Sequence, residues 1–281
     1  MAKRRGQAKG LQRGLASVVR RVGLATVLGV VGMLQIPGCN VVPFDAAPGK
    51  PSVVKAGSAA HAAGMFDQCP QHFPGFVPAV AWPGQQRALC FDGFAVLHSG
   101  QSKTPVYVVE RLDRASVEAA KGVKRVDRFY PEARLPAADR AQLADYPGSG
   151  YDRGHMAPAG DMATESAKAQ SFSLANMVPQ APELNQRDWN QIEQATRKYA
   201  ARAGGDVFVF TGPSFTQRPS TIGPGQVWVP GHTWKVVYSR GERRVWAYWM
   251  ENSAGKHSLK PISYQEFTQR SGLRLLPDSE P

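Results

Sequence analysis

The amino-acid sequence predicts an α+β fold, with one domain around a mostly antiparallel sheet and helices inserted between the strands. Runs rich in β-branched and aromatic residues lie between glycine, serine and proline, and segments with helical periodicity separate them. The chain has 281 residues, of which 42% are hydrophobic, so it can bury a core. Its 28 glycines and 22 prolines follow no repeat period, which excludes collagen-like and solenoid folds and favours long loops.

The order of elements follows from these runs. Five segments are expected to be strands: 87–98, 104–111, 206–211, 226–239 and 243–250. Three segments are expected to be helices: 137–143, 184–201 and 263–271. The clearest is 184–201, where Trp189, Ile192, Thr196 and Tyr199 recur at spacings of three and four before two glycines end the segment.

The N-terminus has the pattern of an export signal. Residues 1–39 contain seven basic residues and no acidic residue, and all seven precede the uncharged apolar run 22–36. That run is shorter than the roughly 20 residues that span a membrane, and has the proportions of a signal-peptide core. Ile36-Pro37-Gly38-Cys39 resembles a lipobox, which makes Cys39 the candidate lipidation site. An uncleaved anchor and ordinary cleavage remain alternatives, because Pro37 departs from the lipobox pattern.

The remainder divides into a tether and a folded domain. Residues 40–65 are rich in small residues, proline and glycine and have no apolar period, so we expect a flexible tether before a domain at 66–281. The body should be exported to the periplasm or outer surface, membrane-tethered or otherwise secreted. In such a compartment Cys69 and Cys90 can form a disulfide, stabilising the fold by roughly 3 kcal/mol. Two buried free thiols are the alternative.

The net charge of +12 is unevenly distributed. Seven positive charges belong to residues 1–39, and the rest of the chain has a net charge of +5. This smaller excess fits a polyanionic partner but does not require one.

A set of polar residues between 152 and 193 carries the candidate chemistry. Asp152-Arg153-Gly154-His155 follows a glycine-rich turn, and Asn176 lies in a later loop. Asn185 and Glu193 are eight positions apart on the predicted helix, about 80° in azimuth, so both can face one cleft. Phosphodiester hydrolysis needs a base near neutral pH, cations on the phosphate, and an oxygen ligand for a divalent ion. These residue types supply each part.

The motifs D-R-G-H-M-A-P, N-M-V-P-Q and N-x₃-W-N-x₂-E resemble those of the DNA/RNA non-specific endonucleases, over about 66–278. The resemblance implies a ββα-metal active-site motif, with His155 as general base and Asn185 as direct ligand of one Mg²⁺ ion, which Mn²⁺ could replace. It further implies that Glu193 orients water around the ion and that Arg153 and Arg128 bind phosphate, with Arg125 a substitute for Arg128. Asn176 is implied to position the active-site loop or His155.

The sequence thus predicts an exported, metal-dependent endonuclease acting on DNA, RNA or both. Its expected partners are nucleic acid, a membrane through the N-terminal lipid or anchor, and a second copy in a possible homodimer. The alternative is a catalytically inactive nucleic-acid-binding or DNA-uptake lipoprotein on the same fold. A zinc hydrolase is disfavoured, because no histidine and cysteine spacing typical of zinc occurs.

Overall fold

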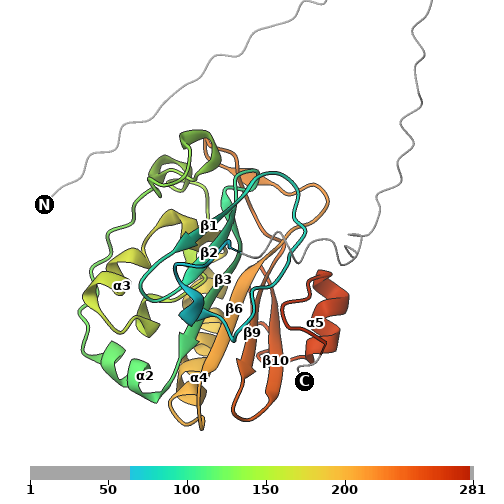
Figure 1. Cartoon of the computed structure of the whole chain (residues 1–281). Coiled ribbons are helices and arrows are strands. Elements are labelled where there is room, and N and C mark those ends of the chain that lie inside the picture. The colour runs from blue at the N-terminus through green and yellow to red at the C-terminus, as the bar shows by residue number, and fades with distance from the viewer. Residues whose placement is uncertain (1–63, 279–281) are drawn as a thin grey trace, which may run out of the picture. The chain divides into compact units, whose positions relative to one another are not determined.

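A computed structural model describes residues 64–278 of the chain (Figure 1). The predicted signal peptide, the lipidation site Cys39 and nearly all of the predicted tether lie outside the described residues. Within 64–278, no helix is both long and apolar enough to cross a membrane.

The centre of the fold is a six-stranded sheet in which every neighbouring pair is antiparallel. Its strand order is β1 (Gln86–Cys90), β2 (Ala95–Ser99), β3 (Thr104–Leu112), β6 (Val207–Ser214), β9 (His232–Ser239) and β10 (Arg244–Glu251). Two small antiparallel sheets join β4 (Asp152–His155) to β5 (Met177–Gln180) and β7 (Thr221–Ile222) to β8 (Val227–Trp228). The predicted α+β class is confirmed.

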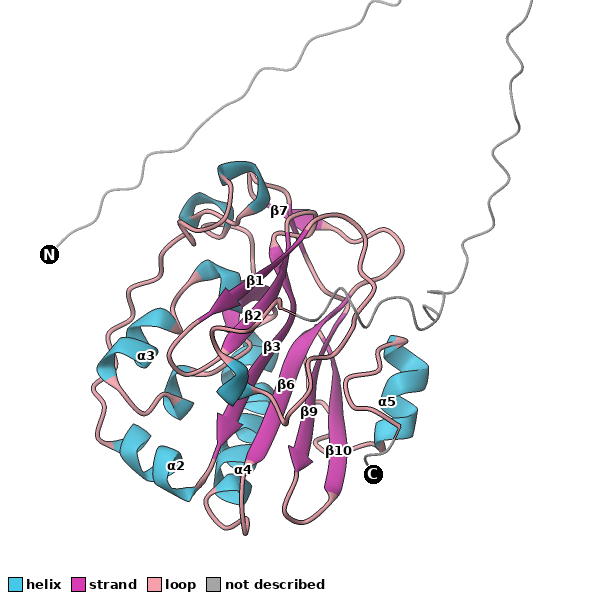
Figure 2. Ribbon diagram, in the orientation of Figure 1, coloured by secondary structure: helices cyan, strands magenta, loops and turns pink. Residues whose placement is uncertain are grey.

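Helices cover both faces of the sheet (Figures 1 and 2). The helices α2 (Arg114–Lys121), α3 (Glu165–Gln170) and α4 (Asn190–Ala200) lie on one side, and α5 (Tyr264–Ser271) lies on the other. Successive strand residues point to opposite faces, so each strand contributes to two cores. Trp234 of β9 packs with Phe267 of α5, whereas Val96 and Val108 pack with Ile192 of α4.

Two predicted strands are each divided in the structure. Segment 87–98 is a hairpin of β1 and β2, because Asp92 and Gly93 form a turn in which Phe91 N donates to Phe94 O at 2.9 Å. Segment 226–239 contains β8 and β9, separated by Pro230 and Gly231, where the chain leaves one sheet for another.

The predicted helices also need correction. Segment 137–143 forms no α-helix, and the chain makes two short 3₁₀ turns at Ala137–Asp139 and Leu143–Asp145. Segment 184–201 begins with a π-helical segment, Leu184–Trp189, before α4. The sequence prediction missed α2, although Asp113 and Ser116 form a capping box at its start. It also missed α3, which Thr164 caps.

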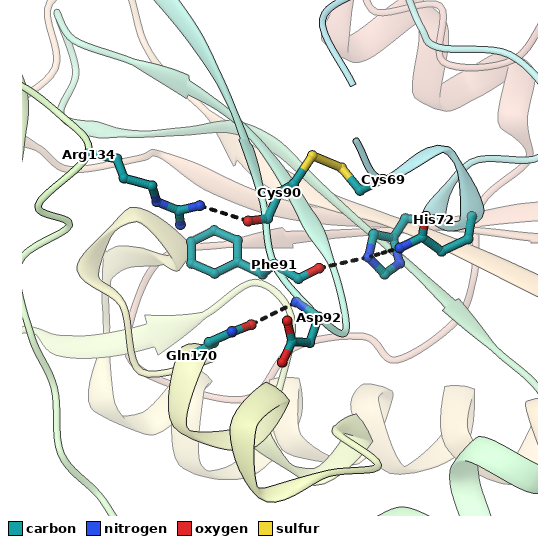
Figure 3. Close-up of a disulfide and its surroundings, with 8 residues drawn as sticks. Cys69, His72, Cys90, Phe91, Asp92, Arg134 and Gln170 are labelled. Atoms are coloured by element: carbon teal, nitrogen blue, oxygen red, sulfur yellow. Dashed lines mark hydrogen bonds between the residues drawn. A yellow bond between two sulfur atoms is a disulfide. The ribbon is translucent and has the colours of Figure 1, made fainter. Parts of the chain in front are cut away.

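Cys69 and Cys90 form the predicted disulfide, which joins the start of the described chain to the end of β1 (Figure 3). Arg134 braces this junction, because its Nη1 donates to Cys90 O at 2.8 Å and its guanidinium lies 4.3 Å from the ring centre of Phe91. His72 contacts Phe91 O through Nε2 at 2.9 Å. The N-terminal residues are therefore bound to the edge of the sheet.

Candidate active site

The D-R-G-H motif forms β4, which pairs with β5 so that His155 lies opposite Met177 and Gly154 opposite Val178. The glycine is needed for packing, because a Cβ at Gly154 would lie 2.6 Å from the Cβ of Gln180. The π-helical segment and α4 follow β5 in the chain. Together these elements form the expected ββα unit.

A cavity of about 690 Å³ opens over this unit. It brings together three of the predicted site residues, His155, Arg153 and Asn185, together with Asp152 and Arg125. The other predicted residues, Asn176, Glu193 and Arg128, do not line this cavity. His155, Arg153 and Asn185 can therefore contact a substrate in this cavity. Asn176, Glu193 and Arg128 can influence such a substrate only indirectly or from outside the cavity.

His155 is held between two aromatic rings. Its ring centre lies 5.8 Å from that of Phe129 and 5.1 Å from that of Phe172. Nε2 is enclosed and finds no hydrogen-bond partner among the described residues, whereas Nδ1 is not enclosed. Burial lowers the pKa of His155 to about 3, so the imidazole is neutral near neutral pH. A neutral ring with an open nitrogen can accept a proton.

Two guanidinium groups border the cavity. Arg153 lies 4.2 Å from the ring centre of Phe129 and 5.9 Å from that of Tyr146, and it forms no ion pair with the described residues. Arg125 lies 5.5 Å from the ring centre of Phe172 and donates to Asp127 Oδ1 at 2.6 Å. Arg128 is exposed outside the cavity wall. The structure thus brings Arg125 to the site in the place where Arg128 was predicted.

Asp152 orients the side chain of the predicted metal ligand. Its Oδ2 accepts hydrogen bonds from Asn185 Nδ2 at 2.9 Å and from Gln186 Nε2 at 2.8 Å. With its nitrogen engaged, the amide of Asn185 has its carbonyl oxygen free of partners among the described residues. Asp152 therefore controls which atom of Asn185 is available in the cavity.

Asn176 is fully buried and fastens the segment that follows His155. Its Oδ1 accepts from Ala157 N at 2.9 Å, and its Nδ2 donates to Ala157 O at 2.8 Å and to Ser171 O at 2.9 Å. Its own carbonyl accepts from Met156 N at 3.0 Å. Through these contacts Asn176 holds the backbone at the end of β4.

Glu193, which is half-buried on α4, belongs to a group of charges between α4 and the sheet. The other members are Glu110 on β3, Lys235 on β9, and the ion pair of Asp161 with Arg197. Burial raises the pKa of Glu193 to about 7, against the opposing effect of Lys235. Sequence reasoning missed this group. Two signals could have revealed part of it: Arg197 follows Glu193 by one helical turn, and Lys235 interrupts an apolar strand.

The donor set at the cavity suits a hard divalent ion. No cluster of three or more histidine, cysteine or acidic side chains that could hold a metal occurs within residues 64–278. Mg²⁺ often takes only one or two protein oxygens and retains its waters. The free carbonyl oxygen of Asn185 beside the Asp152 carboxylate fits this preference.

The comparison with known proteins identifies the family. The model of the DNA/RNA non-specific endonuclease family matches residues 74–277, which include every cavity residue named above. The chain belongs to the DNA/RNA non-specific endonuclease family. Mitochondrial endonuclease G of Bos taurus is 30% identical over 258 residues, covering 85% of this chain and 81% of that protein.

Two further relatives give the extent of the similarity within the DNA/RNA non-specific endonuclease family. Nuclease C1 of Cunninghamella echinulata var. echinulata is 35% identical over 158 residues. Those residues are 52% of this chain and 62% of that protein, so less than two thirds of its length is covered. A chain in the crystal structure of the EndoG/EndoGI complex superposes with a TM-score of 0.62 at 26% identity, covering 69% of this chain and 87% of that one.

Proposed function

We propose that this chain is an exported, Mg²⁺-dependent nuclease that hydrolyses phosphodiester bonds of DNA, RNA or both. The observation that carries the proposal is the single cavity in which a neutral His155, the unpaired Arg153 and the free oxygen of Asn185 meet. The family match supports the same chemistry. The disulfide supports export, because such bonds persist in oxidising compartments.

In this proposal His155 is the general base. Its open Nδ1 takes a proton from the attacking water, and the proton on Nε2 stays enclosed between the aromatic rings. A neutral imidazole is suited to this step because its lone pair is available throughout the neutral range. Asn176 holds the adjoining backbone, which fixes the position of the ring relative to the phosphate.

Arg153 and Arg125 supply positive charge to the phosphoryl oxygens. Guanidinium groups suit this role because they stay charged and donate two parallel hydrogen bonds. The ring of Phe129 beneath Arg153 restrains the side chain, so less freedom is lost when phosphate binds. These contacts act on the backbone alone, which accounts for weak sequence preference.

Asn185, oriented by Asp152, would hold the divalent ion, and Glu193 would act on the water around it from behind the cavity wall. A bound Mg²⁺ would stabilise negative charge on the phosphate and the leaving oxygen. The carboxyl of the half-buried Glu193 lies among compensating charges from Lys235 and Arg197, which offset the cost of its partial burial.

The first test is degradation of plasmid DNA and of RNA with Mg²⁺, with Mn²⁺ and with a chelator. We expect cleavage with either metal and none with the chelator. Nucleic-acid binding without cleavage under every metal condition would instead support the inactive binding protein.

The sharper test compares two substitutions. His155→Ala should lower the cleavage rate by roughly 10²–10⁴ and leave Mg²⁺ binding intact, because only the base is lost. Asn185→Ala should weaken metal binding, and excess Mg²⁺ should restore part of its activity. Cleavage rates across a Mg²⁺ titration distinguish the two. Rescue of His155→Ala alone by excess metal would reverse the assigned roles.

A further inference from the structure

A second cavity of about 430 Å³ adjoins the active-site cavity. Gln186 and Asn190 line both cavities, so the two cavities share a wall about one helical turn long. The other residues that line the second cavity are Arg187, Asp188, Gln191, Lys256 and His257. A chain lying in the first cavity can therefore continue into the second.

The loop that carries Lys256 is anchored at both ends. Asn252 accepts from Ala181 N at 2.7 Å and donates to Pro179 O at 3.0 Å and Pro230 O at 2.9 Å. His257 donates its backbone N–H to Asp188 Oδ2 at 2.9 Å, and its Nδ1 contacts the same oxygen at 2.9 Å. The position of Lys256 relative to the π-helical segment is thus fixed by its neighbours.

The charges of the second cavity are unevenly compensated. Asp188 is its carboxylate, and His257 engages it through two contacts. Arg187 donates only to the backbone carbonyls of Glu183 and Gly255. Within residues 64–278, neither Arg187 nor Lys256 has a carboxylate partner, and both are exposed. The cavity therefore presents two cations, Arg187 and Lys256, and one carboxylate, Asp188, which already accepts two contacts from His257. This balance of charge favours an anion.

We propose that this second cavity binds a backbone phosphate of the nucleic acid next to the scissile one, with Lys256 and Arg187 as its cations. The inference rests on the proposed nuclease function, since it assigns the path of that same substrate. It extends the binding site beyond the residues around His155, and it assigns the loop at 252–257 to substrate binding.

The test measures binding of a fluorescein-labelled single-stranded oligonucleotide to the full chain by anisotropy, in chelator and across a salt series. The variants are Lys256→Ala and Lys256→Glu. Matched controls are Lys260→Ala and Lys260→Glu, which make the same charge changes at an exposed residue near the loop but outside both cavities.

We expect Lys256→Ala to weaken binding by about two- to fivefold, the size of one exposed ionic contact, and Lys256→Glu to weaken it further. The slope of log affinity against log salt should fall by about 0.7 for a single strand, because one phosphate contact is lost. Lys260 variants should match the parent. Equal effects at positions 256 and 260 would overturn the proposal.

Cleavage kinetics separate this proposal from the proposed function. Lys256→Ala should raise KM for an oligonucleotide more than KM for a mononucleotide phosphodiester, which is too short to reach the second cavity. If the parent cleaves nucleic acid but the variants at 256 and 260 have equal affinity and KM, the second binding site is rejected and the nuclease function is retained. Failure of the parent to cleave, combined with weaker binding specific to Lys256, would retain the second site and reject the nuclease assignment.

Discussion

The two faces of the central sheet bury different chemistry. Under α5 the core is aromatic, with Tyr107, Trp234 and Phe267 fully enclosed. Under α4 the sheet also makes apolar contacts, but it additionally presents Glu110 and Lys235 to a group of charges. Adjacent residues of the same strand can belong to different faces, as Trp234 and Lys235 do.

This difference indicates that the face under α5 mainly stabilises the fold, whereas the face under α4 also holds charged groups. Apolar burial stabilises a fold by about 25 cal/mol per Å², whereas a buried carboxylate costs free energy unless it is paired. Burial raises the pKa of Glu110 well above its ordinary value, and neither of its oxygens finds a hydrogen-bond partner among the described residues. Apolar burial under α5 thus contributes stability against the cost of the charges buried under α4.

The largest stability effect should come from the aromatic face. Phe267→Ala should lower the free energy of unfolding by about 3–5 kcal/mol, because it opens a cavity beside Trp234. The cleavage rate per folded molecule should stay near that of the parent. Denaturant unfolding and active-site titration measure the two quantities, with exposed Gln265→Ala as the control. A lower cleavage rate per folded molecule in Phe267→Ala, but not in Gln265→Ala, would contradict the assignment of stability to the face under α5.

Removing the disulfide should have the next largest effect. The double change Cys69→Ser with Cys90→Ser should cost roughly 3 kcal/mol, because the unfolded chain regains the freedom of the closed loop. Thermal unfolding with and without reductant checks this, since reductant should lower the melting temperature of the parent and not of the variant. Alkylation of both cysteines in unreduced protein would show that the bond does not form.

On the α4 side, Asn176→Ala should affect stability and activity together. It leaves the N–H and C=O of Ala157 without their buried partners, which should cost about 1–3 kcal/mol. It also frees the backbone after His155, so kcat should fall while metal binding persists. Unfolding curves and Mg²⁺ titrations separate these effects. A stable variant with full kcat would remove Asn176 from the positioning role.

The smallest effect concerns pH and His98, whose side chain is buried on β2. Burial lowers its pKa from 6.5 to about 4, so protonation favours the unfolded chain. Stability from this residue is complete above about pH 6.5 and is lost as pH falls toward 4, by about 1 kcal/mol at about pH 5.5. His98→Gln should flatten this slope in unfolding experiments. An unchanged slope would assign the acid sensitivity to other groups.

The sequence predicted those features that depend on local spacing. Strand β3, helix α5 and the site residues 153, 155 and 185 occur where expected, because alternation, helical period and motif spacing are short-range signals. The π-helical segment was missed because a pattern of 100° per residue does not distinguish it from an α-helix. The hairpin at Asp92 was missed because apolar residues continue on both sides of the turn.

Long-range features could not be predicted in the same way. Whether Arg125 or Arg128 faces the cavity depends on how an irregular loop packs against Phe172. The meeting of Glu110 with Glu193 depends on the register of β3 and on the placement of α4 above it, and neither is encoded by nearby residues. Arg153, His155 and Asn185 in the cavity were predicted from motifs, whereas the group of charges around Glu193 required the three-dimensional structure.

The bond between Cys69 and Cys90 also has a mechanical consequence. Tension applied to any part of the chain before Cys69 passes through the sulfur atoms into the end of β1, so the residues between the two cysteines carry no load. The pull is received by a strand that is hydrogen-bonded along its length to β2. A molecule held by its N-terminus would therefore receive the force at β1, the edge strand of its sheet. The force would not enter the fold through β4 or the cavity.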